Sequence, residues 1–246
     1  GCLQPGKIKA TYGTGSSIMM NIGEKPILST HGVVTSLAWK IGGHVNYVLE
    51  GNLNYTGAVI TWLKDDLELI SSAAETEALA NKAVKEDGLY LVPAFSGLGA
   101  PYWDSDARAA IVGMSRTTRK AELVRAALEC IAYQITDVVK AMSEDSKICI
   151  GQLCVDGGPT RNAYLMQFQS DLLIADVMVP DAEELSAIGP AYAAGLRLGL
   201  WDETIFTKLK RTAYKPSMED KKRTQKYAGW KDCLLYTSDA ADDLIG

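Results

Sequence analysis

The chain has 246 residues, which is enough for one large domain or two small ones. Apolar residues make up 47% and charged residues 22%, the balance of a globular protein that can build a core. The formal net charge is −5 without a long basic run, which argues against a nucleic-acid surface. No apolar stretch approaches a membrane span, so no membrane partner is expected.

The cysteines favour a reducing compartment. There are five of them (Cys2, Cys130, Cys149, Cys154 and Cys233), with no C-x-x-C pair and only two His. An odd number without metal-ligand spacing predicts neither a disulfide framework nor a zinc site, and no metal-binding residue is assigned. We expect buried free thiols in a cytoplasmic protein, with Cys149 and Cys154 as ordinary strand residues.

The first half of the chain begins with alternating apolar and polar residues and then changes to a helical period. Alternation predicts four strands, at residues 9–12, 17–22, 33–41 and 44–50, with Gly42-Gly43 as a hairpin turn between the last two. Apolar residues at helical spacing predict helices at 55–69 and 73–84.

The second half alternates strands and helices. Strands are expected at 89–93, 109–114, 152–155 and 177–179, and helices at 120–142, 162–173 and 188–200, with Thr118 as a cap. Residues 202–232 are charged and partly helical. This order predicts the α/β class, with a mixed sheet and helices on both faces.

Two glycine-rich turns are candidate phosphate sites. In Thr11-Tyr-Gly-Thr-Gly15, Gly13 and Gly15 allow tight backbone geometry, and the Thr14 hydroxyl could reach a phosphate. A hairpin without a ligand is the alternative.

The second turn, Gly157-Gly158, follows a strand and precedes a helix, where free helix N–H groups could bind an anion. An ordinary strand-to-helix connection is the alternative. Gly57, at the start of a helix, on its own indicates close packing of the backbone and not a ligand contact. Neither the dinucleotide fingerprint nor a Walker A motif is present.

Nearly the whole chain, from Gly1 to about Asp232, resembles the C-terminal domain of the FGGY carbohydrate kinases, closest to the glycerol-phosphorylating branch. The matching runs include TYGTGSSIMMNIGEKP, VPAFSGLGAPYWDSDAR, GMSRTTRKAELVRAALECIAYQ, VDGGPTRNAYLMQFQSDLL and KYAGWK, in order. The resemblance implies an actin-like, ribonuclease-H-like fold. It also implies that ATP and the substrate bind in a cleft between two domains.

The resemblance also implies roles for individual residues. Thr14 would meet the β- and γ-phosphates of ATP, with Gly13 and Gly15 shaping the phosphate hairpin. Gly57 and Thr61 would line the nucleotide pocket, and Gly158 and Asn162 would contact the adenosine end. Mg²⁺ would accompany ATP. The catalytic base of the family lies in a G-D-Q-Q stretch upstream, so no catalytic residue is assigned to this chain.

Two positions depart from the family pattern. Ser17, the expected substrate-contacting residue, stands where a Phe packs on the glycerol carbons, and Thr61 stands where a Gln is common. Asp104 and Asp106 are interpreted as loop-ordering residues and Asp156 as a strand-end turn former, so none of the three is taken as a catalytic base.

We therefore expect residues 1–232 to be the nucleotide-binding domain of such a kinase, without its N-terminal domain. Residues 233–246 resemble a translated sequencing adapter and are expected to have no function and no effect on stability. The expected activity is ATP-dependent phosphorylation of a small polyol, glycerol first. The alternatives are a kinase for another polyol or a ketose, such as erythritol or xylulose, and a non-catalytic actin-like ATP-binding module. Whether the parent protein is a homo-oligomer is left open.

Overall fold

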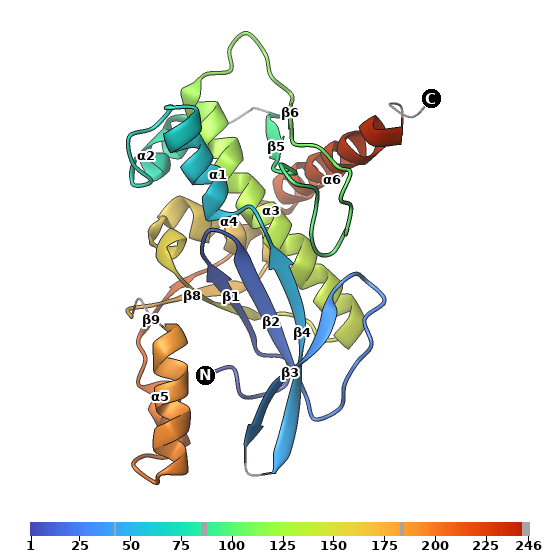
Figure 1. Ribbon diagram of the computed structural model, residues 1–246. Coiled ribbons are helices and arrows are strands. Elements are labelled where there is room, and N and C mark those ends of the chain that lie inside the picture. The colour runs from blue at the N-terminus through green and yellow to red at the C-terminus, as the bar shows by residue number, and fades with distance from the viewer. Residues whose placement is uncertain (42, 85–87, 183–184, 243–246) are drawn as a thin grey trace.

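The computed structural model describes residues 1–41, 43–84, 88–182 and 185–242 (Figure 1). Gly42 of the predicted hairpin turn, and residues 243–246 of the predicted foreign tail, lie outside these ranges. Within them, no helix is long and apolar enough to cross a membrane.

The centre of the fold is a seven-stranded mixed sheet with the order β3-β4-β2-β1-β7-β8-β9. Its strands are β1 (Ile8–Tyr12), β2 (Ser16–Gly23), β3 (Val34–Ile41), β4 (His44–Leu53), β7 (Gln152–Asp156), β8 (Asp176–Pro180) and β9 (Arg211–Tyr214). The pairs β1–β7 and β7–β8 are parallel and the others are antiparallel. The predicted α/β class with a mixed sheet is confirmed.

The alternation along β1 explains how this sheet buries one face. Ile8, Ala10 and Tyr12 are buried in the core, whereas Lys9 and Thr11 between them are only half-buried. Successive side chains of a strand point to opposite faces, so the apolar residues of β1 face the core together. The parallel register then sets Thr11 beside Asp156, which brings the ends of β1 and β7 to the same edge of the sheet.

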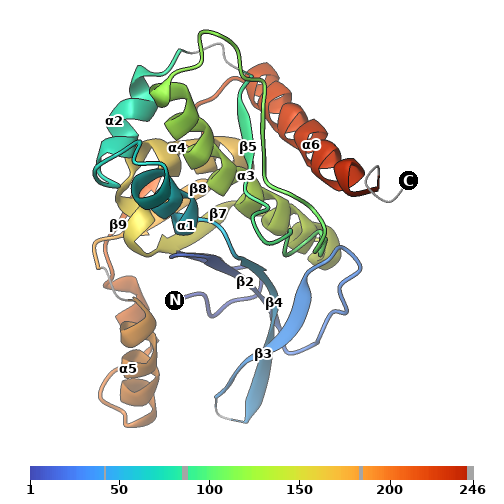
Figure 2. The same ribbon diagram turned by 45° about the horizontal axis from the view of Figure 1, so that its top comes forward.

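One face of the sheet is covered by helices that pack on each other (Figure 2). The long α3 (Lys120–Ser146) packs on β2, β4 and α4 (Ala163–Leu173), and α4 packs on β8 and β9. Above them lie α1 (Gly57–Thr61), which continues as a π-helix (Trp62–Asp66), and α2 (Glu75–Lys82). Strands β5 (Tyr90–Val92) and β6 (Ala110–Val112) form a separate two-stranded sheet beside α3.

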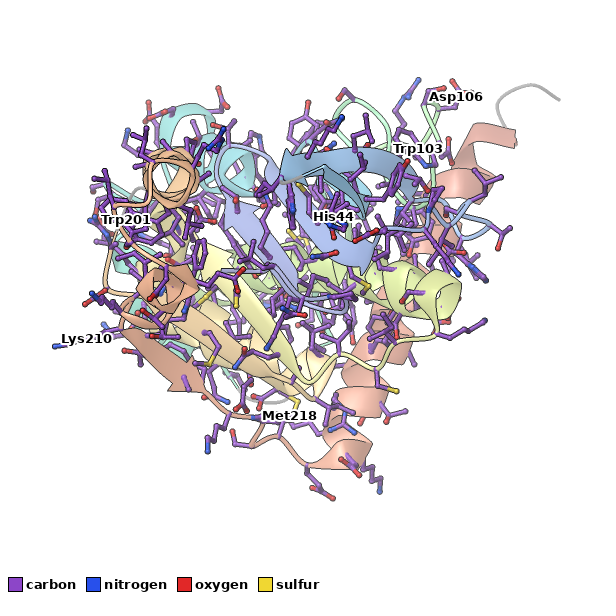
Figure 3. The ribbon with its side chains drawn as sticks, turned by 90° about the horizontal axis from the view of Figure 1, so that it is seen from below. His44, Trp103, Asp106, Trp201, Lys210 and Met218 are labelled. Atoms are coloured by element: carbon purple, nitrogen blue, oxygen red, sulfur yellow. The ribbon has the colours of Figure 1, made fainter. Side chains whose placement is uncertain are left out.

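Helix α5 (Leu185–Arg197) stands away from the sheet, in contrast to the expectation of helices packed on both faces (Figure 1). Its contacts are chiefly with the segment that follows it, which contains a 3-10 helix, η3 (Glu203–Thr207). Tyr192 packs edge-on against Trp201 and Phe206. Figure 3 shows Trp201 on the opposite side of the molecule from Trp103.

The last helix, α6 (Asp220–Asp242), is anchored to α3 by a buried carboxylate. Trp230 Nε1 donates to Asp137 at 2.7 Å, and the Trp230 ring stacks on Tyr133 with 5.2 Å between centroids. The helix continues into the predicted foreign tail, where Cys233 and Leu234 are buried. The expectation that the tail leaves stability unchanged is therefore revised, whereas its foreign origin stays a prediction.

Several local predictions were wrong for identifiable reasons. The cap of α3 is Arg119, whose N–H donates to Glu122 at 2.9 Å, whereas the Thr118 hydroxyl accepts from Ser115 N–H in the preceding turn. The helix predicted at 55–69 ends at residue 66, and β9 falls in a segment that was predicted only as partly helical.

The cysteines also differ in part from the expectation. All five are free, but only Cys130 and Cys233 are buried. Cys149 is exposed and precedes β7, so it is not the strand residue that was predicted, whereas Cys154 lies within that strand.

Candidate functional site

The first glycine-rich turn, at the tip of the β1–β2 hairpin, is docked on the start of α1. The carbonyl oxygen of Gly13 accepts from the Gly57 N–H at 2.9 Å. The carbonyl oxygen of Thr14 accepts from the N–H groups of Ala58 at 2.9 Å and Thr56 at 3.1 Å. The first N–H groups of a helix have no partner within the helix, so these bonds satisfy both elements. They also engage two carbonyl oxygens that would otherwise repel an anion.

The second glycine-rich turn packs against the same hairpin. Gly157 has φ of +100°, and a Cβ there would lie 1.9 Å from the carbonyl oxygen of Tyr12. Only glycine fits such a position. Beside it, the Thr11 hydroxyl donates to Asp156 Oδ1 at 2.7 Å, which joins the ends of β1 and β7. The buried Asp156 carboxylate thus holds two strand ends together, in keeping with a structural role.

A cavity of about 840 Å³ lies against the hairpin and the second turn, and its volume suits a small-molecule ligand. Six of the eight predicted site residues line it: Gly13, Thr14, Gly57, Thr61, Gly158 and Asn162. Its apolar lining comes from Ile60, Leu128, Ile131 and Leu165. Residues that are distant in the sequence thus meet around one cavity.

Asn162 has a structural role as the cap of α4. Its Oδ1 accepts from the Leu165 N–H at 2.9 Å, and its Nδ2 donates to the Thr76 hydroxyl at 3.0 Å. The N–H of Ala163 donates to Glu77 Oε2 at 2.8 Å. The expectation of free N–H groups at this helix start is therefore corrected, because side chains already cap two of them.

Two predicted residues lie away from the cavity. A Cβ on Gly15 would lie 2.3 Å from the carbonyl oxygen of Leu53, so Gly15 allows β2 and β4 to approach each other. Ser17 lies on β2, where Lys9 Nζ donates to its carbonyl oxygen at 3.2 Å and to its hydroxyl at 3.4 Å. Burial lowers the pKa of Lys9, and the nearby Asp156 carboxylate opposes this shift.

Three charged residues at the cavity were not predicted: Lys64, Glu77 and Arg161. Lys64 had a usable signal, because residues 57, 61 and 64 lie on one face of a helix. Arg161 lies within the VDGGPTRN run already singled out, whereas nothing in the sequence marked Glu77. Among the described residues that line the cavity, Glu77 carries the only carboxylate.

The aromatic loop before β6 is ordered by Asp104, one of the two acidic residues for which this role was expected. Asp104 Oδ1 accepts from the N–H groups of Asp106 and Ala107, both at 2.9 Å. Trp103 is more than half exposed, and its Nε1 donates to the carbonyl oxygen of Gly32 at 2.7 Å. Trp103 and Asp106 lie together at one side of the molecule (Figure 3).

The family model of the C-terminal domain of the FGGY family of carbohydrate kinases matches residues 8–198. The chain belongs to this family. The expected actin-like class agrees with the solved structures of FGGY-type sugar kinases that it resembles. A crystal structure of Plasmodium falciparum glycerol kinase with ADP superposes with a TM-score of 0.89 at 35% identity, over 96% of this chain and 48% of that one.

Curated relatives of similar sequence are also glycerol kinases. A glycerol kinase of Petrotoga mobilis is 51% identical over 94% of this chain and 47% of its own length. A glycerol kinase of Geobacillus kaustophilus is 49% identical over 95% of this chain and 48% of its own length. The chain thus spans about half the length of the curated relatives it matches. A xylulose kinase of Rhodospirillum rubrum shares the fold, with a TM-score of 0.82 at 20% identity.

Proposed function

We propose that this chain is the ATP-binding half of an enzyme that phosphorylates glycerol to glycerol 3-phosphate. The observation that carries the proposal is the single cavity on which six predicted nucleotide-site residues converge. Its support comes from relatives near 50% identity that are glycerol kinases. In this proposal residues 1–232 form the nucleotide-binding domain, the N-terminal domain lies elsewhere in the complete protein, and residues 233–246 are foreign.

Within this proposal the residues of the chain bind and orient the nucleotide. The Thr14 hydroxyl and the N–H groups of the hairpin meet the β- and γ-phosphates, and Gly158 lets the backbone approach the adenosine end. Thr61 contributes a hydroxyl to the pocket wall, and Asn162 fixes the start of α4 at the adenosine end of the pocket. Positioning and charge stabilisation are the main protein contributions to phosphoryl transfer, so these contacts are functional without a base.

The described residues that line the cavity do not form a magnesium site by themselves. Mg²⁺ is usually held by one or two carboxylates together with substrate phosphates. Glu77 is the only carboxylate among the described cavity-lining residues, and one of its oxygens already caps α4. We infer that the ion accompanies the phosphates and takes its protein ligands from the N-terminal domain. The same domain would supply the general base.

The acceptor has a second candidate because of Ser17. A small hydroxyl at this position, in place of an aromatic ring, would leave room for a longer acceptor such as a four-carbon polyol or a pentulose. Lys9 donates toward Ser17 Oγ at 3.4 Å, which leaves the hydroxyl proton available to a ligand. A kinase for such an acceptor is therefore the alternative within the same class.

A fusion experiment tests the proposal. The chain alone, with ATP, Mg²⁺ and glycerol, should release no ADP above background. Fused to the N-terminal half of the Petrotoga mobilis relative, it should phosphorylate glycerol. Turnover by the rigorously purified chain alone would contradict the proposal that the N-terminal domain supplies the general base. A folded fusion that binds ATP but phosphorylates neither glycerol nor a longer acceptor would instead support a non-catalytic ATP-binding module.

A further inference from the structure

The carboxylate of Glu77 lies at the cavity, anchored by only one of its two oxygens. Oε2 accepts from the N–H of Ala163 at 2.8 Å, whereas Oε1 has no hydrogen-bond partner among the described residues. Glu77 lies on α2, and the neighbouring Thr76 hydroxyl is bonded to Asn162 at 3.0 Å. These two bonds tie α2 to the start of α4 and hold the carboxylate in place at the cavity wall.

The surroundings of Glu77 suit a flat ring. Ala73, Ala74 and Ala78 of the same region are small, and the apolar side chains Ile60, Leu128, Ile131 and Leu165 also line the cavity. The glycine turn at Gly13 and Thr14 provides backbone for the phosphate end, and Gly158 and Asn162 lie at the adenosine end. A nucleotide with its phosphates at the hairpin would direct its base toward the start of α4, beside α2.

We propose that Glu77 is a specificity residue that selects a base with an exocyclic amino group on its outer edge, as in adenine. The inference rests on the proposed nucleotide site and goes beyond it by naming the residue that reads the base. A carboxylate oxygen only accepts hydrogen bonds. The amino group of adenine donates one, whereas a base without that group leaves the oxygen unpaired, and a carbonyl there would repel it.

The test compares two nucleotides that differ only in this amino group: ATP and purine riboside triphosphate. Ligand-detected NMR titrations of the chain with Mg²⁺ give the two dissociation constants even when binding is weak. We expect the chain to favour ATP about tenfold, the size of one hydrogen bond to a charged group. In Glu77→Gln, one amide oxygen can still cap Ala163 while the amide NH2 faces the base. The preference should therefore fall to about twofold or less.

Glu75→Gln is the matched control. Glu75 lies on the same helix, and its substitution by Gln removes the same charge. Its Oε1 accepts from the Ser71 N–H at 3.0 Å, and it does not line the cavity. This variant should keep the wild-type preference. Thermal melts of both variants show whether the capping of α4 survives.

Three results would overturn the inference, and they are distinguishable. An equal preference in wild type and Glu77→Gln, with ATP still bound, would mean that Glu77 does not read the base, while the nucleotide site stands. A change confined to the ratio of ATP to 2′-deoxy-ATP would mean that the carboxylate holds the ribose. Lack of binding by both nucleotides in the wild-type chain would overturn the nucleotide site and the inference together.

Discussion

Gly57 lies where the β1–β2 hairpin packs against the start of α1. A Cβ at this position would lie 2.4 Å from the carbonyl oxygen of Gly13, which is backbone and cannot turn away. We predict that Gly57→Ala destabilises the fold by about 1–3 kcal/mol, as overpacking does, and weakens nucleotide binding. Urea unfolding and a nucleotide titration measure the two effects.

Gly151→Ala, at the exposed position before β7, serves as the control, because a Cβ there meets nothing within 4 Å. A surface change of this kind should alter the free energy of unfolding by no more than about 0.5 kcal/mol. If Gly57→Ala behaved like this control, the hairpin would not be docked as described.

Ser17 is the residue on which the acceptor depends in our account. A Phe at this position in the complete enzyme would bury apolar area against a three-carbon acceptor, worth about 1–3 kcal/mol at roughly 25 cal/mol per Å². We predict that Ser17→Phe lowers KM for glycerol and raises it for four- and five-carbon acceptors. Such a change in binding should leave kcat nearly constant. An unchanged ranking of acceptors in steady-state assays would remove Ser17 as a specificity residue.

At the level of single residues, the sequence singled out residues that line the cavity where a glycine-rich turn follows a strand, as at Gly13 and Gly158. Gly57 alone predicts only close packing, and it entered the expected site through the family resemblance. Glu77 could not be predicted, since it reaches the cavity only through the packing of α2 on the start of α4. Gly15 closes the hairpin by accepting from the Gly13 N–H at 2.8 Å, but the sequence did not predict its close approach to Leu53 of β4.

Among the elements, the loop before β3 is tied to the end of α3 by Asp145. Ser29 Oγ donates to its Oδ2 at 2.5 Å, and the Thr30 N–H donates to Oδ1 at 3.0 Å. Burial alone would raise the pKa of Asp145, but these hydrogen bonds and one with His31 outweigh it and lower the pKa to about 2. The carboxylate therefore stabilises the fold above its ordinary pKa of about 3.9.

We predict that Asp145→Asn lowers the free energy of unfolding by about 1–2 kcal/mol at pH 7, as loss of a hydrogen-bonded charge does. As the pH falls from about 4 toward 2, the wild type loses this contribution and the difference should shrink. Urea unfolding at pH 7, 4 and 3 measures it. Glu144→Gln, an exposed neighbour, should show no such trend. A pH-independent difference would mean that Asp145 does not act through its charge.

Most elements were predicted in order, but the strands' pairing partners were not. Strands β5 and β6 have the same local pattern as the other strands, and nothing local distinguishes them from strands of the main sheet. Among the described residues, however, they pair only with each other. The short β9 lies in a charged segment and is defined by its pairing with β8. Strand pairing is a long-range property, so the alternation of apolar and polar residues identifies a strand without assigning it to a sheet.

For the whole molecule, our proposal makes the cavity one wall of a nucleotide cleft. We predict that this chain alone binds ATP with a dissociation constant of about millimolar or weaker, because the opposite wall would supply no polar contacts. Exposed apolar residues lie in the segment that follows α5, including Leu198, Leu200 and Trp201. Around Pro101, Tyr102 and Trp103 only Trp103 is exposed, because the first two are half-buried.

The most direct test of the account is to map where ATP binds on the isotope-labelled chain. Amide chemical shifts recorded during a titration with MgATP up to about 10 mM would report the contact residues at the weak affinity expected. Our account predicts that the shifts concentrate at Gly13, Thr14, Gly57 and Gly158, around the cavity. Shifts that concentrate elsewhere, or no shifts at all, would contradict the claim that this chain carries the nucleotide-binding half of a kinase.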